Sequence, residues 1–300
     1  MHVDREGSRG SDRADDFRQL TRHTGYTADR LRRDFVIERL LVRLLEDSPD
    51  RWMRFDDWRL EYRVDGPSAA DAFGDVSAPA RAAVDAALRR ASAFRGLDRV
   101  NVVVRAGVPY PQVPEGPALA YEVEAFDHDG AICELDLTIG FAFPPADEIE
   151  WLPGLELPAA QDGPLPQIPT RSRVTQLAAR LGAYTGRTSR FPSYEDLLTI
   201  ARYAPQVMCT ADRMRRALDR VWPWTATPAW PLAVPAPPPW WADAYRDGAF
   251  ELGLASALAV GHAWAAALLD PILSGTVPPG ATWEPGKLRW APPDRHGQSD

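Results

Sequence analysis

The chain has 300 residues, of which 45% are hydrophobic and 25% charged, and this composition excludes a disordered tail, a collagen-like chain and a disulfide scaffold. The formal net charge of −8 argues against a general binder of nucleic-acid backbones, which needs a basic surface, although a local basic groove remains compatible with it. Two cysteines, Cys133 and Cys209, cannot form a disulfide framework and fit a reducing cytoplasm.

The N-terminal half predicts an α+β domain over residues 25–150, after a disordered leader over residues 1–24. Apolar spacing predicts a helix at 27–45, a strand at 52–64, an alanine-rich helix at 79–94 and a short strand at 99–105. Two alternating runs, 119–126 and 131–139, flank an Asp-Gly turn, which is a strong hairpin signal. The stretch 144–170 holds several prolines and little periodicity, so we expect the domain boundary there.

The C-terminal half predicts a helical domain over residues 165–290 and a polar tail over residues 291–300. Apolar stripes indicate helices that begin near Val174, at 193–204 with Ser193 as N-cap, and at 210–222. A proline-rich crossover follows at 223–239, and we expect Trp240, Trp241 and Tyr245 to anchor it. The alanine-rich stretch at 249–269 reads as a buried helix that ends at Pro271, and not as a membrane span.

The familiar catalytic motifs do not occur in the sequence. It contains no GxGxxG, P-loop, HExxH, GxSxG or CxxC motif, and Lys287 is its only lysine. The remaining candidates are carboxylates and arginines: Asp71 and Asp75 follow the first strand, and Glu134 and Asp136 lie two apart on a later one. Alternate residues of a strand share a face, so such a pair could hold Mg²⁺ or simply form a solvated acidic face.

The order of several segments resembles a known family. A strand with an acidic turn and a later Leu-Asp-Leu strand precede a helix with a basic residue among apolar ones, at 176–181. Arg-x-x-x-x-x-Asp-Leu-Leu at 190–198 and Pro-Pro-x-Trp-x-x-x-Tyr at 238–245 follow. From about residue 27 to 290 the chain resembles the AbiEii/AbiGii nucleotidyltransferase toxins, the enzymatic half of type IV toxin–antitoxin systems.

The resemblance implies a minimal nucleotidyltransferase domain followed by a helical domain, with Mg²⁺ as cofactor and an NTP as substrate. It assigns catalytic roles to Asp71, Arg180 and Asp196. It further implies metal binding by Asp71, Asp75 and Asp136, and nucleotide binding by Ser68, Arg173 and Arg190. A cognate antitoxin, a tRNA or other RNA (or a protein) as acceptor, and a cytoplasmic location are implied as well.

The sequence departs from the family pattern at several of these positions. The small-residue turn of the family falls at 54–58, where this chain has no glycine, and Phe73 occupies the position of the second carboxylate. Asp75 replaces that carboxylate only if the turn shifts by two residues. Arg180 stands where the family has lysine, and Asp196 is also spaced from Ser193 like the acidic member of a helix capping box.

Two functions therefore remain open from the sequence. The first is a divergent nucleotidyltransferase toxin with reduced activity. The second is a catalytically inactive relative that binds RNA, a nucleotide or a protein partner. Because Arg173 and Arg180 lie seven residues apart on one helix, they share a face, which either binds phosphates or is a solvated surface.

Overall fold

The protein comprises two compact units, Met1–Arg171 and Ser172–Asp300. The structure, a computed structural model, describes residues 9–64, 76–94, 100–110, 117–128, 130–141, 148–155, 165–186, 192–221 and 231–293. In this part of the chain the first unit combines helices with a mixed sheet, and the second is helical apart from a short hairpin. This confirms the α+β and helical character expected of the two halves. The border between the two units lies after Arg171.

The first unit is built on one sheet with the strand order β3-β5-β6-β2-β1-β8-β7, and β4 also pairs with β5. Its helices are α1 (Arg9–Thr24), α2 (Ala28–Asp47) and α3 (Ala78–Ala93). Its strands are β1 (Trp52–Arg54), β2 (Arg59–Tyr62), β3 (Asn101–Val104), β4 (Val108–Tyr110), β5 (Ala118–Asp127), β6 (Gly130–Gly140), β7 (Ile149–Pro153) and β8 (Gln167–Arg171). Parallel pairs β2–β6 and β1–β8 join antiparallel hairpins, so the sheet is mixed.

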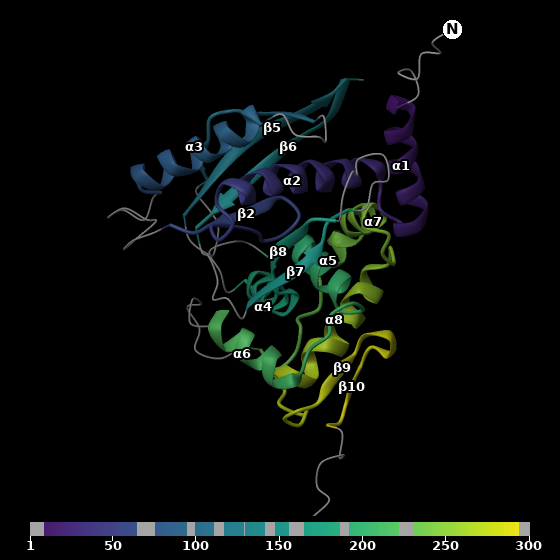
Figure 1. Ribbon diagram of the computed structural model, residues 1–300. Helices are drawn as coiled ribbons and strands as arrows, with labels where there is room; N and C mark the ends of the chain where they lie inside the picture. Colours follow the sequence, from purple (N-terminus) through teal and green to yellow (C-terminus); the bar gives the residue numbers. More distant parts are fainter. Residues whose placement is uncertain are drawn as a thin grey trace, which may run out of the picture. The chain divides into compact units, whose positions relative to one another are not determined.

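Helix α2 (Figure 1) contributes many of the buried apolar side chains in the core of the first unit. The Thr27 hydroxyl caps its N-terminus by accepting a hydrogen bond from the Arg30 N–H, as a Thr at this position commonly does. Leu31, Phe35 and neighbouring apolar residues of α2 are buried with the inward residues of the sheet and of α3. The buried residues of α2 include the consecutive stretch 34–41, so more than one side of this helix is covered.

The β5–β6 hairpin confirms the strongest turn signal of the sequence. Gly130 follows the turn with φ +126°, a backbone conformation that a residue with a Cβ atom rarely adopts. The pairing then runs without a break from Ala118 opposite Gly140 to Ala125 opposite Cys133.

Three other expectations for this unit differ from the structure. Residues 52–64, expected as one strand, form the β1–β2 hairpin, because the chain turns back at 55–58. Residues 9–24, expected to be a disordered leader, form α1. Strands β7 and β8 lie in the proline-containing stretch that we expected to be irregular; Pro169 and Pro153 obscure the strand pattern there without preventing the pairing.

The second unit packs its helices around a separate core (Figure 1). Its elements are α4 (Arg173–Tyr184), α5 (Tyr194–Tyr203), α6 (Ala211–Val221), the 3₁₀ helix η5 (Pro239–Trp241), α7 (Ala242–Glu251), α8 (Leu258–Leu273), β9 (Thr282–Glu284), the 3₁₀ helix η6 (Pro285–Lys287) and β10 (Arg289–Ala291). Helices α4, α5 and α6 agree with the expected stretches. The Ser193 hydroxyl caps α5 by accepting from the Glu195 N–H at 3.1 Å.

Two expectations about the last helices were wrong. The stretch at 249–269 is not one helix: α7 ends at Glu251, and α8 begins at Leu258 and continues past Pro271. Proline blocks the hydrogen bond from its own nitrogen, and α8 loses only that bond because it ends within two residues. Trp240 was expected to be a buried anchor, but 79% of it is exposed.

The other two expected aromatic anchors are in contact with the core. The Trp241 ring lies edge-to-face with Tyr184, at 5.9 Å between ring centroids. Tyr245 is 1% exposed. A Cβ atom at Gly261 would collide with the Tyr245 ring, so only glycine on α8 admits this tyrosine. Trp241 and Tyr245 thus pack against the core, whereas the neighbouring Trp240 is exposed.

Candidate functional site

Four of the eight expected site residues lie in the described part of the chain. Ser68, Asp71 and Asp75 belong to residues 65–75, and Arg190 to residues 187–191, all outside it. Asp136 is on β6 in the first unit, and Arg173, Arg180 and Asp196 are in the second unit.

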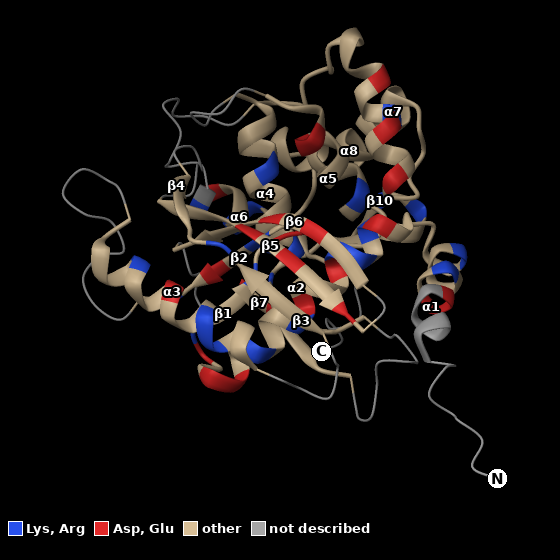
Figure 2. Cartoon of the chain, turned by 90° about the horizontal axis from the view of Figure 1, so that it is seen from above, with Lys and Arg blue, Asp and Glu red and all other residues tan. Residues whose placement is uncertain are grey.

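Asp136 is part of a row of carboxylates on one face of the sheet, which we call the acidic ladder. The register of the hairpin places Asp136 opposite Glu122 and Glu134 opposite Glu124. Figure 2 shows these acidic positions on β5 and β6. Like charges directly opposite each other on paired strands are unfavourable, and within the described residues Arg105 offsets part of this cost through ion pairs with Glu122 and Glu124.

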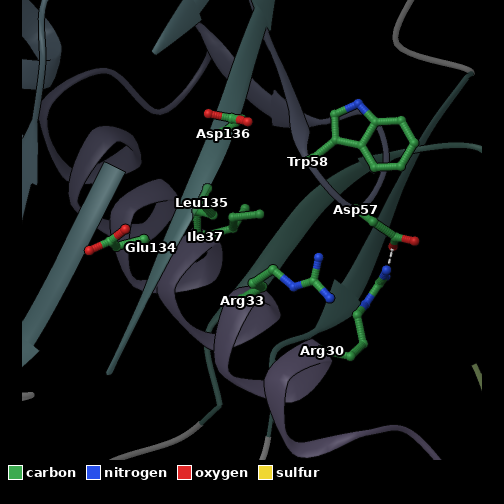
Figure 3. A pocket seen from close by; sticks show the side chains of 8 residues that line it. All are labelled: Arg30, Arg33, Ile37, Asp57, Trp58, Glu134, Leu135 and Asp136. Carbon is green, nitrogen blue, oxygen red and sulfur yellow. Dashed lines mark ion pairs between the residues drawn. The ribbon is translucent and has the colours of Figure 1, made fainter. Parts of the chain in front are cut away.

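A pocket of about 340 Å³ lies beside Asp136 on the β6 side of the β1–β2 turn (Figure 3). Helix α2 contributes three of its side chains, the turn two and β6 three: Arg30, Arg33, Ile37, Asp57, Trp58, Glu134, Leu135 and Asp136. Trp58 is held in place by its backbone, because its carbonyl accepts the Thr138 N–H at 2.9 Å. Its indole is 40% exposed and lies across the pocket from β6.

Buried ion pairs fix the wall of the pocket between α2 and the β1–β2 turn. Arg30 pairs with Asp57 and with Asp34, the latter at 3.0 Å. Arg54 pairs with Asp34 at 2.6 Å and with Glu38 at 3.3 Å. These carboxylates outweigh the burial of the guanidinium and raise the pKa of Arg54. Arg30 therefore has a structural role in addition to lining the pocket.

Glu38 lies at the far end of the same ion-pair network. Its carboxylate accepts the Leu155 N–H at 2.6 Å as well as pairing with Arg54. Burial is the largest influence on this group and raises the pKa of Glu38 above its ordinary value in spite of both partners.

The opposite side of the β1–β2 turn carries a second group of charged residues. The guanidinium carbons of Arg59 and Arg171 each lie 4.5 Å from the centroid of the Phe55 ring. Arg59 also pairs with Glu61 at 2.7 Å, and Glu61 is fully buried. A Cβ atom at Gly140 would lie 2.5 Å from the Arg59 guanidinium, so a glycine in β6 makes room for this pair.

In the second unit, Arg180 of α4 and Asp196 of α5 form a buried ion pair. The Arg180 Nη1 donates to the Asp196 Oδ1 at 3.2 Å, and Asp196 is 0% exposed. These two residues, which the family resemblance singled out in separate motifs, therefore meet. Arg173, at the start of α4, instead lies over the Tyr203 ring at 5.8 Å and remains partly exposed.

Sequence reasoning missed Arg33 and Trp58 as pocket residues. Trp58 lies in the stretch 54–58, which already departs from the family pattern, and that departure was the available signal. Arg33 gave no signal because the arginines of α2 are numerous. Only the packing of α2 against the sheet shows which of them lies next to β6.

The described residues do not complete a metal site by themselves. Among them, no group of three or more His, Cys, Asp or Glu side chains is arranged to hold a metal ion. Asp136 offers the carboxylate oxygens that Mg²⁺ prefers, but further ligands must come from elsewhere. In the same part of the chain, no helix is long and apolar enough to cross a membrane.

Comparison with known proteins shows similarity at the level of solved structures. No protein-family model matches the chain, and no curated protein matches it either. Among solved structures, it is similar to MenT4, a nucleotidyltransferase toxin from Mycobacterium tuberculosis H37Rv. The similarity covers 83% of this chain and 93% of MenT4, with 18% sequence identity and a TM-score of 0.46. The function is therefore argued from the residues of this chain.

Proposed function

We propose that the protein is a nucleotidyltransferase-like toxin of the AbiEii/AbiGii type, which transfers a nucleotide from an NTP to an RNA, such as tRNA, or to a protein. The observation that supports this most directly is the Arg180–Asp196 pair. Two residues from separate motifs, 16 positions apart, meet at 3.2 Å in a buried position, as expected of members of one site. We further propose a cytoplasmic location and a cognate antitoxin.

The transfer requires a bound metal ion, stabilisation of the charge that develops on the phosphoryl group, and departure of pyrophosphate. Asp71, Asp75 and Asp136 would hold Mg²⁺, which neutralises the phosphate charge when it is bound. Arg180 would stabilise the negative charge that develops on the transferred phosphoryl group, with Asp196 holding its guanidinium in position. The acceptor hydroxyl oxygen forms a bond to the α-phosphorus and releases its proton to water, while the bond from the α-phosphorus to the oxygen shared with the β-phosphate breaks, so pyrophosphate leaves.

A labelled-nucleotide assay tests this proposal. The purified protein is incubated with each of the four labelled NTPs, Mg²⁺ or Mn²⁺, and total tRNA. We expect weak transfer, because Phe73 supplies no oxygen where the family has its second carboxylate. Asp71→Ala and Asp196→Asn should abolish the transfer. Asp243→Ala is the matched control, since it removes an exposed carboxylate of α7 that pairs only at the surface with Arg246.

An inactive binding module is the alternative, and Phe73 is the observation that favours it. In that case Arg180 and Asp196 have only a structural role, and the chain binds RNA, a nucleotide or a protein. Phe73→Asp separates the two functions, because it restores the missing carboxylate. Gain of transfer in this variant supports an eroded transferase. Absence of transfer in both the wild type and Phe73→Asp favours the binding module.

A further inference from the structure

Strand β6 is longer than its neighbour β2, and part of one of its edges is therefore open. On one side β5 pairs with β6 along residues 130–140. On the other side β2 pairs only with Thr138, Ile139 and Gly140. No strand in the described part of the chain pairs with this edge of β6 between residues 130 and 137. We call this stretch the open edge.

The backbone groups of two residues point toward the open edge. The Thr138 N–H donates to the Trp58 carbonyl and therefore points to the β2 side. Backbone groups alternate in direction along a strand, so those of Asp136 and Glu134 point to the same side. An unpaired row of N–H and C=O groups is a template for an additional strand.

The open edge borders the pocket, which gives an additional strand room to lie there. Leu135 and Asp136 lie on one side of the pocket and Trp58 on the other (Figure 3). Trp58 directly precedes the first residue of β2, and its carbonyl, which accepts the Thr138 N–H, closes that end of the gap. A strand placed beside residues 132–136 would thus extend along β6 until it reaches the Trp58 indole.

The two faces next to the open edge differ in chemistry. On one face, Glu134 and Asp136 belong to the acidic ladder, in which Arg105 is the partner of the other two carboxylates. On the other face, Leu135 adjoins Ile37 of α2, and Arg30 and Arg33 of the same helix also line the pocket. Side chains of a strand alternate between faces, so a complementary strand carries basic residues at every second position and apolar residues between them.

We propose that the open edge of β6 binds an extended segment of a partner protein, with alternating basic and apolar residues, as an added strand. The backbone hydrogen bonds would supply affinity and the acidic ladder would select the segment. A second copy of this chain fits poorly, because pairing two open edges would bring Glu134 and Asp136 next to carboxylates of the same kind. A phosphate backbone is repelled by the same carboxylates.

The proposal shares Asp136 with the proposed metal site, but its test uses neither NTP nor Mg²⁺, so its outcome is separate from that of the transfer assay. The probe is a fluorescein-labelled peptide of the sequence Lys-Val-Lys-Val-Lys-Val-Lys, and fluorescence anisotropy measures its binding to the full chain. A peptide with Glu in place of each Lys tests charge. A third peptide, methylated on alternate backbone nitrogens, keeps the charge and loses the N–H groups that face β6.

A pair of variants at Glu134 separates backbone pairing from charge. Glu134→Ala removes one carboxylate and keeps the N–H, and we expect it to weaken binding about threefold, the usual size of an exposed charge pair. Glu134→Pro also removes the N–H that points to the open edge, and we expect a loss of about tenfold or more. Proline at this position leaves the ladder with β5 intact, because the lost N–H faces away from β5.

The outcomes decide the proposal in either direction. The proposal is supported if the basic peptide binds and neither the acidic peptide nor the methylated peptide binds. Equal binding of the methylated peptide would overturn it, and this result does not depend on whether Glu134→Pro folds. Equal affinity of folded Glu134→Pro and Glu134→Ala overturns it too. The proposal is also overturned if a single-stranded RNA oligonucleotide binds and the basic peptide does not.

Discussion

At the scale of single residues, the Arg180–Asp196 pair has a structural consequence that does not depend on catalysis. A charge buried in a helical core is costly unless a partner neutralises it. Asp196 is fully buried, so its removal leaves the Arg180 guanidinium without the carboxylate shown to pair with it. The family motifs singled out both residues. The motifs could not show that the pair is buried, because burial depends on how α4 packs against α5.

We expect Asp196→Ala to lower the free energy of unfolding by about 3–5 kcal/mol. The double replacement Arg180→Met with Asp196→Leu should restore most of this loss, since it removes both charges. Urea unfolding monitored by circular dichroism measures the difference. Asp243→Ala, which removes a carboxylate from an exposed pair, serves as control and should leave stability unchanged. If Asp196→Ala were as stable as the wild type, this result would contradict the buried-pair interpretation.

Glu38 gives a pH dependence whose sign can be derived. Burial raises its pKa in the folded state, so the folded protein holds this proton more tightly than the unfolded chain. The contribution of Glu38 to stability is therefore greatest at low pH, and it is lost as the pH rises from the ordinary glutamate pKa through the raised one.

Glu38→Gln removes this titration. The variant should consequently become more stable relative to the wild type as the pH rises from 4 to 7. Urea midpoints of both proteins at several pH values provide the test. The prediction is contradicted if the difference between the two urea midpoints does not change with pH. It is also contradicted if the difference shifts in favour of the wild type as the pH rises.

At the scale of elements, local sequence predicted the helices and the central hairpin better than it predicted the edges of the sheet. The β5–β6 hairpin and α4 to α6 have regular apolar periods and clear end signals, and they agree with the structure. The β1–β2 turn lacks glycine and proline, and its signal is the weaker one of Asp56 and Asp57; the Asp56 carboxylate accepts the Trp58 N–H at 3.2 Å. The open edge of β6 depends on the unequal lengths of two strands 70 residues apart in sequence, which no local pattern encodes.

The aromatic residues after the proline-rich crossover provide a prediction at this scale. Tyr245→Ala should lower the free energy of unfolding by about 3–5 kcal/mol, because it leaves a cavity in the core. Trp240→Ala should leave stability unchanged, since most of that side chain is already in water. Thermal unfolding of both variants is the measurement. A larger loss for Trp240→Ala than for Tyr245→Ala would show that the exposed tryptophan is the anchor after all.

At the scale of the whole molecule, each of the two units has its own hydrophobic core. The core of the first unit is formed by α2, α3 and the sheet, and that of the second by its helices and the β9–β10 hairpin. In the sequence, the alternating apolar pattern gives way to helical periods near residue 172. Two separate cores favour unfolding in separate cooperative units.

Trp283 tests this separation because it belongs to the second core alone. It is fully buried, and its Nε1 donates to the Ala204 carbonyl at 2.7 Å. Trp283→Ala therefore removes apolar contacts and leaves a buried carbonyl without this donor, which together should cost about 3–5 kcal/mol. Hydrogen exchange measured by mass spectrometry should show faster exchange in peptides from α4, α5 and α8. Peptides from β5 and β6 should keep wild-type protection, as should α2. Leu137→Ala, in the core of the first unit, is the reciprocal control and should reverse the pattern. Equal loss of protection in both units for both variants would mean that the chain unfolds as a single cooperative unit.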